Sequence, residues 1–278
     1  METPLILVDD PRPKVRRLTL NRPEKRNALS NALRAQLFDR LRQADRDRQV
    51  SVVVIRGAGS CFSAGYDLAQ DPSEPLARPT ATVDGFWSRH VVEGWMEMWD
   101  MATPLIAQVH GWCLAGGTEL ATACDLVYVA DDAAIGYPPV RLMSPPDMAW
   151  QPVLLGLRRG MEAMLTGDSM TGTEAVAGGF ANRAVPVGEL EELVLAMAER
   201  VAKVPFELLA LNKRVMHRSM EALGVRQAIR AGTELQALGF HQPSSMAYRA
   251  TLGEGLTAAF QARDEAFGNY RTAEPPPG

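Results

Sequence analysis

Residues 104–130 read PLIAQVHGWCLAGGTELATACDLVYVA. The apolar runs at the two ends of this stretch, PLIAQVHG and DLVYVA, predict strands, and GGTELATAC between them predicts a helix. Two glycines and a threonine therefore lead directly into Glu119 within a segment that is otherwise apolar. The flanking runs draw this glutamate toward the interior, where a carboxylate is costly to bury. Such a residue needs either a function or a buried partner.

The alternation of strands and helices extends outward from this stretch. PLILVD, VRRLTLN and VSVVVIRG are typical of short strands, and residues 28–47 carry apolar side chains at helical spacing behind Ser30. This order is typical of an α/β protein. Residues 86–101 predict another helix, and AAIGYP predicts a short strand. From about residue 150 every periodic segment predicts a helix, which indicates a helical C-terminal region that covers an active site or mediates assembly.

Composition narrows the class of protein. A chain of 278 residues with 46% hydrophobic residues is long enough for one large domain, alone or with an appendage. A net charge of -4 and the absence of a basic cluster argue against binding to nucleic acid, and no apolar run is long enough to span a membrane. We therefore expect a soluble, cytoplasmic protein. Cys61, Cys113 and Cys124 lie in apolar settings without ligand spacing, which predicts buried thiols and no metal site.

The glycine turn before Glu119 has a chemical interpretation. If a helix begins near residues 115–117, its first N–H groups lack intrahelical partners and point outward at the positive end of the helix dipole. Glu119 then lies on the same face as Gly116. An N–H that holds a developing oxyanion beside a carboxylate that accepts a proton suits proton abstraction next to a carbonyl. A second N–H is expected from GSCFSAGYDL at 59–68, which follows the strand VSVVVIRG.

Five segments in order carry a resemblance to a known family. They are LNRPEKRNALS (20–30), FSAGYDL (62–68), PLIAQVHGWCLAGGTELATACDLVYVADDAAIGYP (104–138), TGDSMTGTEAVAGGFANRAVP (166–186) and EGLTAAFQARDEAF (254–267). Together they resemble the crotonase superfamily, the enoyl-CoA hydratase/isomerase family. The resemblance implies an α/β spiral of ββα units over residues 1–202 and a C-terminal helical subdomain over 203–278. It also implies a homotrimer or a homohexamer.

The resemblance also implies a site for an acyl-CoA thioester. The substrate supplies the coenzyme A, so that no separate cofactor is expected. Two backbone N–H groups, those of Tyr66 and Gly116, map to the oxyanion hole, and only the amide of Tyr66 is needed for that role. The expected contacts with CoA are Lys25, Arg26, Ala64 and Arg263, the last often supplied by a neighbouring subunit in this family. The expected acyl-pocket residues are Trp87, His90, Tyr137 and Trp150, although a histidine among tryptophans is also typical of a packed core.

The catalytic pair departs from the family pattern. Hydratases of the family use a glutamate that Glu119 matches and a second glutamate in a Pro-Glu pair, which is Pro138-Pro139 here. A proline side chain can neither transfer a proton nor activate water. Asp147 lies eight residues after Pro139, where the dienoyl-CoA isomerases and the 4-chlorobenzoyl-CoA dehalogenase branch of the family place a catalytic aspartate. The resemblance therefore implies Glu119 and Asp147 as the catalytic carboxylates.

Alternatives remain for both carboxylates and for the activity. Asp147 is also typical of a cap for a helix that begins at MAWQPVLLG, and Glu119 of a buried partner for an arginine such as Arg141. The sequence favours an acyl-CoA isomerase or hydratase. A hydrolase or dehalogenase-like enzyme that uses Asp147, and an acyl-CoA-binding protein without catalysis, are the other two hypotheses.

Overall fold

The computed structural model describes residues 4–69 and 86–268, with side chains from 91 onward in the second range. Its main sheet has six strands in the order β1-β2-β3-β4-β6-β8. β1 is antiparallel to β2, and the remaining neighbours are parallel. The strands are β1 (Ile6–Arg12), β2 (Val15–Leu20), β3 (Val52–Gly57), β4 (Leu105–Val109), β6 (Leu126–Ala130) and β8 (Arg183–Val185). The sequence predicted all of these except β8.

A second, two-stranded parallel sheet joins β5 (Trp112–Leu114) to β7 (Ala134–Gly136). β5 follows β4 after two residues and leads through Ala115 into helix α3 (Gly116–Ala123). A bridge between Ser63 and Cys113 attaches the segment after β3 to the same small sheet. The two segments expected to supply oxyanion-hole N–H groups therefore lie side by side.

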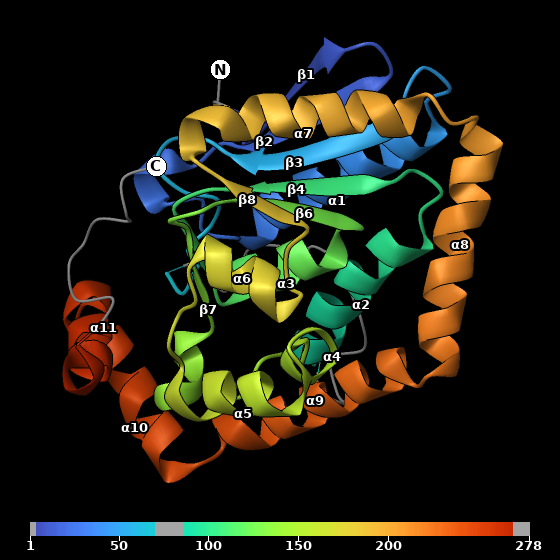
Figure 1. Ribbon diagram of the computed structural model, residues 1–278. Helices are drawn as coiled ribbons and strands as arrows, with labels where there is room; N and C mark the ends of the chain where they lie inside the picture. The colour runs from blue at the N-terminus through green and yellow to red at the C-terminus, as the bar shows by residue number, and fades with distance from the viewer. Residues whose placement is uncertain (1–3, 70–85, 269–278) are drawn as a thin grey trace.

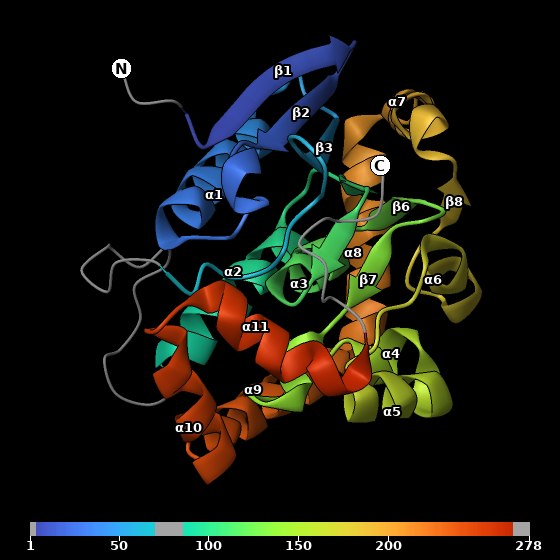
Figure 2. The same ribbon diagram turned by 90° about the vertical axis from the view of Figure 1, so that its left-hand side faces the viewer.

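Two helices cover opposite faces of the main sheet, α1 (Asn31–Arg46) on one and α7 (Val187–Ala202) on the other (Figures 1 and 2). α1 begins as expected at Ser30, whose side-chain oxygen accepts a hydrogen bond of 3.2 Å from the N–H of Leu33. The apolar face of α1 is buried, including Leu37 and Phe38. The core thus lies between the sheet and these helices, together with α2 (Phe86–Asp100) and α3.

The C-terminal half is helical, as the sequence predicted. Its helices are α4 (Gln151–Leu154), α5 (Gly156–Thr166), α6 (Gly172–Gly178), α7, α8 (Phe206–Ala222), α9 (Val225–Phe240), α10 (Pro243–Leu252) and α11 (Leu256–Asp264). α4 and α5 are separate helices, because the chain breaks at Leu155 and Gly156, where the glycine has φ 68°. Three helices follow α8, and α10 contacts both α9 and α11.

The helical region is tied to the α/β core by a buried lysine on α8. The ammonium group of Lys213 donates to the carbonyl oxygens of Met98 and Thr103, at 2.9 and 3.1 Å, and lies 2.9 Å from a carboxylate oxygen of Asp125. The division of the chain after residue 202 falls between α7 and α8 and stays a prediction. All three cysteines are buried free thiols. In the described part of the chain, no helix is long and apolar enough to cross a membrane.

Candidate active site

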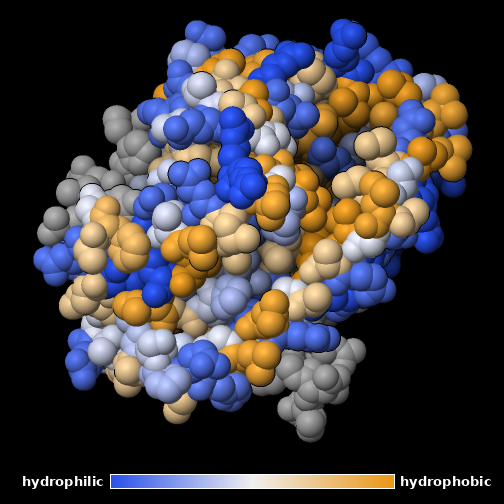
Figure 3. Space-filling view, turned by 60° about the horizontal axis from the view of Figure 1, so that its bottom comes forward, coloured by the Kyte–Doolittle hydropathy of each residue, from blue (hydrophilic) through white to orange (hydrophobic). Residues whose placement is uncertain are grey.

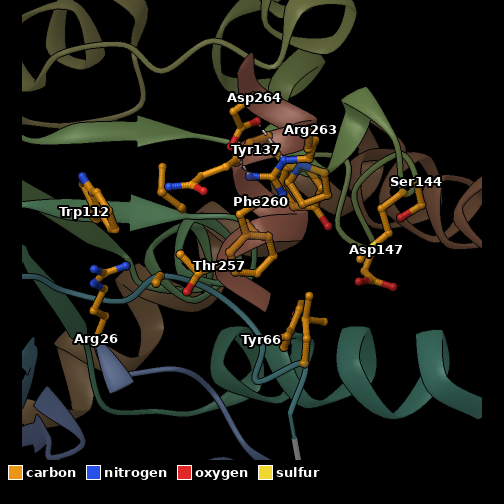
Figure 4. Close-up of a pocket in the computed structure, with 18 of the residues that line it drawn as sticks. Arg26, Tyr66, Trp112, Tyr137, Ser144, Asp147, Thr257, Phe260, Arg263 and Asp264 are labelled. Carbon is orange, nitrogen blue, oxygen red and sulfur yellow. Dashed lines mark hydrogen bonds and ion pairs between the residues drawn. The ribbon is translucent and has the colours of Figure 1, made fainter. Parts of the chain in front are cut away.

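A cavity of about 200 Å³ opens where the two glycine-rich turns meet the C-terminal helices. Tyr66, Tyr137 and Asp147 line its inner part, and residues of α9 and α11 close it from the other side (Figure 4). The lining also includes Arg26 and Arg263, so that residues expected to contact the acyl group and the CoA border one cavity. Its wall is mostly apolar, which is typical of a small-molecule site.

The geometry of the α3 N-terminus depends on two glycines. Gly116 is the first residue of α3, so its N–H has no acceptor within the helix. A Cβ on Gly65, which has φ 103°, would lie 3.3 Å from the Gly116 nitrogen, so the two turns touch at this point. The N–H of Leu29 donates to the carbonyl oxygen of Gly65, and the carbonyl oxygen of Leu29 accepts from the N–H of Asp67. In such a parallel bridge the N–H of Tyr66 points away from Leu29. The backbone N–H groups of Tyr66 and Gly116 are therefore close to each other.

Glu119 is fully buried one turn into α3. Its Oε2 accepts a hydrogen bond from the Tyr66 hydroxyl, and its Oε1 accepts from the N–H of Met148 at 3.2 Å. The Tyr137 hydroxyl is a further donor. Burial raises the pKa of Glu119 from its ordinary value of 4.5 to about 7, although these donors oppose the shift. Arg141 pairs instead with Asp168 and Asp264, so the structure gives no support to a Glu119–Arg141 pair.

Asp147 is also buried, with a relative exposure of 2%, but it has fewer donors than Glu119. Its Oδ1 atom has no hydrogen-bond partner within the described part of the chain. Burial and the nearby Glu119 carboxylate raise the pKa of Asp147 well above its ordinary value. The expected capping role is wrong, because α4 begins at Gln151 with Trp150 as its N-cap and without a side-chain capping bond.

The side chain of Tyr66 is also part of the site, in addition to the amide expected for the oxyanion hole. Its ring lies against Gly116, where an added Cβ would come within 2.7 Å of a ring carbon. Its hydroxyl accepts a hydrogen bond of 3.0 Å from the indole N–H of Trp95 on α2 and donates to Glu119. Tyr66 lines the cavity, whereas Glu119 lies behind it. The phenol therefore stands between the cavity and the buried carboxylate.

A buried arginine lies behind this pair. The Arg34 side chain of α1 has 0% relative exposure, and its guanidinium carbon lies 5.7 Å from the Tyr66 ring centre and 5.4 Å from the Trp95 ring centre. Burial lowers the pKa of Arg34, and the nearby Tyr66, Asp147 and Glu119 favour its charged form. A positive charge behind the site favours ionisation of the carboxylates in return.

The mouth of the cavity contains two of the expected CoA contacts. The Arg26 guanidinium lies 4.7 Å from the centre of the Trp112 ring, and Arg26, Trp112 and Ala64 all line the cavity. Arg26 has φ 51°, a left-handed conformation that places its side chain at the end of the short helix η1 (Pro23–Lys25). Lys25 is exposed in η1 and is not part of the cavity wall.

The fourth expected CoA contact, Arg263, reaches the cavity from α11 of the same chain. Its guanidinium makes two hydrogen bonds with Asp264, at 2.8 and 2.7 Å. Asp264 is fully buried and also pairs with Arg141 at 2.9 Å. Phe260 and Gln261 of α11 line the same cavity, so this helix forms part of its wall.

The expected acyl-pocket residues divide into three groups. Tyr137 lines the cavity. Trp150 does not reach it; its indole N–H donates to Thr118 at 3.0 Å and its ring packs on Phe180, behind α3. Trp87 and His90 belong to α2, but their side chains lie outside the described residues. The sequence analysis did not identify Arg34. The feature that could have indicated it is a charged residue among the apolar residues on the buried face of α1.

Comparison with known proteins identifies the family of the chain. The family model described as enoyl-CoA hydratase/isomerase matches residues 12–268. The chain belongs to the enoyl-CoA hydratase/isomerase family. It is 31% identical over 216 residues to a probable mitochondrial enoyl-CoA hydratase of Dictyostelium discoideum, covering 77% of this chain and 75% of that protein. It is 32% identical to the 2,3-dehydroadipyl-CoA hydratase of Escherichia coli, covering 90% and 93%.

Solved structures of the family show the same fold. A crystal structure of an enoyl-CoA hydratase/isomerase from Xanthobacter autotrophicus Py2 is 32% identical, with a TM-score of 0.86 over 96% of this chain and 99% of that one. The expected crotonase fold is thereby confirmed, and the protein is an enzyme of the enoyl-CoA hydratase/isomerase type.

Proposed function

We propose that this enzyme moves a carbon-carbon double bond in an enoyl-CoA thioester, with Glu119 as the base and Asp147 as the acid. The observation that carries this proposal is the pair of buried carboxylates with raised pKa values at one cavity. Two titratable groups whose environments differ are the usual basis for acid and base roles. The thioester oxygen would accept hydrogen bonds from the N–H groups of Tyr66 and Gly116 while the enolate forms.

The hydrogen bonds support this division of the two roles. Glu119 has three donors, from Tyr66, Tyr137 and Met148, which stabilise its ionised form. The Asp147 carboxyl has an oxygen without a partner in the described part of the chain, and a buried carboxylate in such a place stays protonated. Glu119 is therefore the proton acceptor, and Asp147 donates its proton to the carbon at the other end of the shifting double bond. The proton then returns from Glu119 to Asp147, which resets both groups.

Hydration is the second candidate, because the relatives named above are called hydratases. Pro139 lines the cavity where the hydratases of the family carry their second glutamate. Glu119 and Asp147 would then have to position and split one water molecule between them. The hydrolase and binding-protein hypotheses are less favoured, because Asp147 in its protonated form is a poor nucleophile and because binding alone needs no acid-base pair.

The experiment that tests this proposal uses deuterated, oxygen-18-labelled water and a panel of 2-enoyl, 3-enoyl and dienoyl thioesters of CoA. Mass spectrometry of the recovered thioesters should show deuterium without oxygen-18. Oxygen-18 in the acyl chain would show that the enzyme adds water to the double bond and would contradict isomerisation. Thioesters recovered without either label, although they bind, would refute both. The matched variants Glu119→Gln and Asp147→Asn should each lose most deuterium incorporation while the binding of CoA is retained.

The state of assembly and the location stay predictions. A homotrimer or homohexamer agrees with the apolar side chains that α5 and α8 expose at helical spacing. They are Leu157, Met161 and Leu165 on α5 and Leu208, Leu211 and Val215 on α8. Hydrophobic patches are visible among hydrophilic ones on the side of the molecule that carries the C-terminal helices (Figure 3). Light scattering at several protein concentrations would determine the assembly, and a monomer would contradict it.

A further inference from the structure

The peptide unit between Ala115 and Gly116 carries one of the two N–H groups proposed for the oxyanion hole. Ala115 lines the cavity and precedes α3 with φ 48° and ψ −122°, a conformation that a residue with a side chain rarely adopts. Such a residue keeps this conformation only where the surrounding structure holds it. The N–H of Ala115 is held by the carbonyl oxygen of Gly136, to which it donates at 2.9 Å. The direction of the next N–H, that of Gly116, depends on what holds the carbonyl oxygen of Ala115.

Thr118 holds this carbonyl oxygen with two hydrogen bonds. Its backbone N–H donates to the Ala115 oxygen at 2.9 Å, and its side-chain hydroxyl donates to the same oxygen at 2.7 Å. A peptide unit is planar and trans, so its C=O and its N–H point in opposite directions. The bonds that fix the carbonyl oxygen of Ala115 therefore also fix the direction of the Gly116 N–H.

A buried tryptophan determines where the Thr118 hydroxyl sends its proton. The indole N–H of Trp150 donates to this hydroxyl at 3.0 Å, and an indole N–H cannot accept a hydrogen bond. The single hydroxyl proton of Thr118 is therefore directed to the Ala115 oxygen. Thr118 has 0% and Trp150 has 1% relative exposure, and the Trp150 ring packs on Phe180 with 4.8 Å between the ring centres. The hydrogen bonds thus form a fixed, buried chain from Trp150 to the oxyanion peptide.

This chain connects the oxyanion hole to the loop that carries Asp147. Trp150 lies in that loop, and its own N–H donates to the carbonyl oxygen of Met148 at 2.8 Å. In a buried chain of hydrogen bonds each bond polarises the next and strengthens it. The indole N–H of Trp150 therefore makes the Thr118 hydroxyl a stronger donor, and the polarised peptide makes the Gly116 N–H a stronger donor in turn.

We propose that Thr118 is a positioning residue, which holds and polarises the Gly116 N–H for the enolate oxygen, with Trp150 as its support. The inference rests on the proposed function, in which this N–H stabilises the enolate of the thioester. Thr118 is not part of the cavity wall, so it acts through the peptide unit between Ala115 and Gly116 and not on the substrate itself.

The test compares Thr118→Val with the wild type by the exchange of α-protons for deuterium in a 3-enoyl thioester of CoA. Valine has the shape of threonine, but it cannot donate to the Ala115 oxygen. A lost oxyanion donor costs about 100-fold to 1,000-fold and a displacement of about 1 Å about 100-fold, so kcat should fall by about tenfold to 100-fold. The dissociation constant of free coenzyme A, which has no thioester carbonyl, should change by less than about twofold.

Two further variants isolate the hydroxyl. Thr118→Ser keeps the donor and should retain kcat within about threefold of the wild type. Thr122→Val is the matched control, because it removes a hydroxyl from the same helix whose Oγ1 has no hydrogen-bond partner within the described residues. It should stay within about twofold. Wild-type exchange in Thr118→Val, or an equal loss in Thr118→Ser and Thr118→Val, would overturn the proposal.

Infrared spectroscopy provides a readout that a merely structural role would not move. A saturated acyl-CoA with carbon-13 at the thioester carbonyl reports on the oxyanion hole without turnover, because a hydrogen bond from an N–H lowers the carbonyl stretching frequency. The band should shift down on binding to the wild type and move back toward the free thioester in Thr118→Val. Trp150→Phe keeps the Thr118 hydroxyl without its support, so it should give a smaller change in the same direction. It also decides the question if Thr118→Val does not fold. A band at the wild-type position in the folded variants would contradict the positioning role.

The outcomes separate this inference from the proposed function. If the wild type exchanges protons with no thioester of the panel but the carbonyl band responds to Thr118→Val as described, the proposed reaction is wrong and the positioning role stands. If the wild type exchanges protons and Thr118→Val does so equally fast with an unchanged band, the positioning role is wrong and the proposed function stands.

Discussion

The backbone N–H of Met148 lies 3.2 Å from Oε1 of Glu119 and donates a hydrogen bond to it. This bond joins the residue next to Asp147 directly to the carboxylate of α3. The loop before α4 thus orients one acid through its backbone and supplies the other from its side chain. Burial raises the pKa of both carboxyl groups, and the nearby Glu119 carboxylate raises the pKa of Asp147 further.

The first prediction concerns the pH dependence of the rate. Activity requires an ionised Glu119, whose pKa is about 7, and a protonated Asp147. The value of kcat/KM should therefore rise with pH through about 7. Tyr66→Phe removes a donor that lowers the pKa of Glu119, so the rising limb should move to higher pH in that variant. A flat profile between pH 5 and 8 would contradict the assignment.

The same pKa shift predicts how stability depends on pH. Between pH 4.5 and about 7 the folded protein holds a proton on Glu119 that the unfolded chain has lost. The free energy of unfolding should therefore fall as pH rises through this range, and a shift of this size corresponds to about 3 kcal/mol. Asp147 acts in the same direction, so the measurement compares urea unfolding of the wild type with Glu119→Gln at pH 5 and pH 8. The variant should lose about this much of the pH dependence; an unchanged dependence would be evidence against the raised pKa.

Arg34 tests the electrostatic support of the site. Arg34→Met replaces a buried guanidinium by an apolar side chain of similar length, and removal of one member of a buried charged group is destabilising by about 3 to 5 kcal/mol. The positive charge of Arg34 lowers the pKa of Glu119, so its removal should raise that pKa. The rising limb of kcat/KM should then move to higher pH, and the rate at pH 7 should fall. Arg46→Met, which removes the same charge from an exposed position of α1, is the control. Identical pH profiles for wild type and Arg34→Met would refute a role for this charge.

The sequence predicted the parts of the site that depend on local pattern. The glycine turn before Glu119 and the apolar runs around it were enough to place α3 and its N-terminus correctly. β5 and β8 were missed because each has three residues and is defined by its pairing with a distant strand. A short strand of this kind carries too little periodicity to be recognised.

The contacts of the Tyr66 side chain could not be predicted for a related reason. Its partners, Trp95 and Glu119, belong to two other elements, and only the folded chain brings the three together. Asp147 was identified by its spacing after Pro139. The absence of a hydrogen-bond partner for its Oδ1 within the described residues, and the start of α4 at Gln151, depend on the fold and could not be predicted from spacing. Spacing in the sequence therefore located candidates, and the hydrogen bonds of the fold separated their roles.

The helix that closes the cavity gives a further prediction. Asp264 is fully buried between Arg263 and Arg141, and Asp264→Asn leaves these two guanidinium groups without its charge. α11 should then detach locally, so that KM for the thioester rises about tenfold or more while kcat changes little. Hydrogen exchange should show faster amide exchange over residues 256–267. The control Glu254→Gln removes the same charge from an exposed position, and an equal effect there would contradict this role of Asp264.

The last prediction tests the glycine at the start of α3. Gly116→Ala places a methyl group within 2.7 Å of the Tyr66 ring, so the ring must move away and take the hydroxyl from Glu119. The proposed oxyanion N–H of residue 116 shifts as well, and the loss of one such donor costs about 100-fold to 1,000-fold in kcat. Gly188→Ala, at an exposed position of α7 where an added Cβ meets nothing within 4 Å, is the matched control. It should leave the rate unchanged and stabilise the protein by about 0.4 to 1 kcal/mol. If the two variants have equal rates, the close approach of Tyr66 and Gly116 has no part in catalysis.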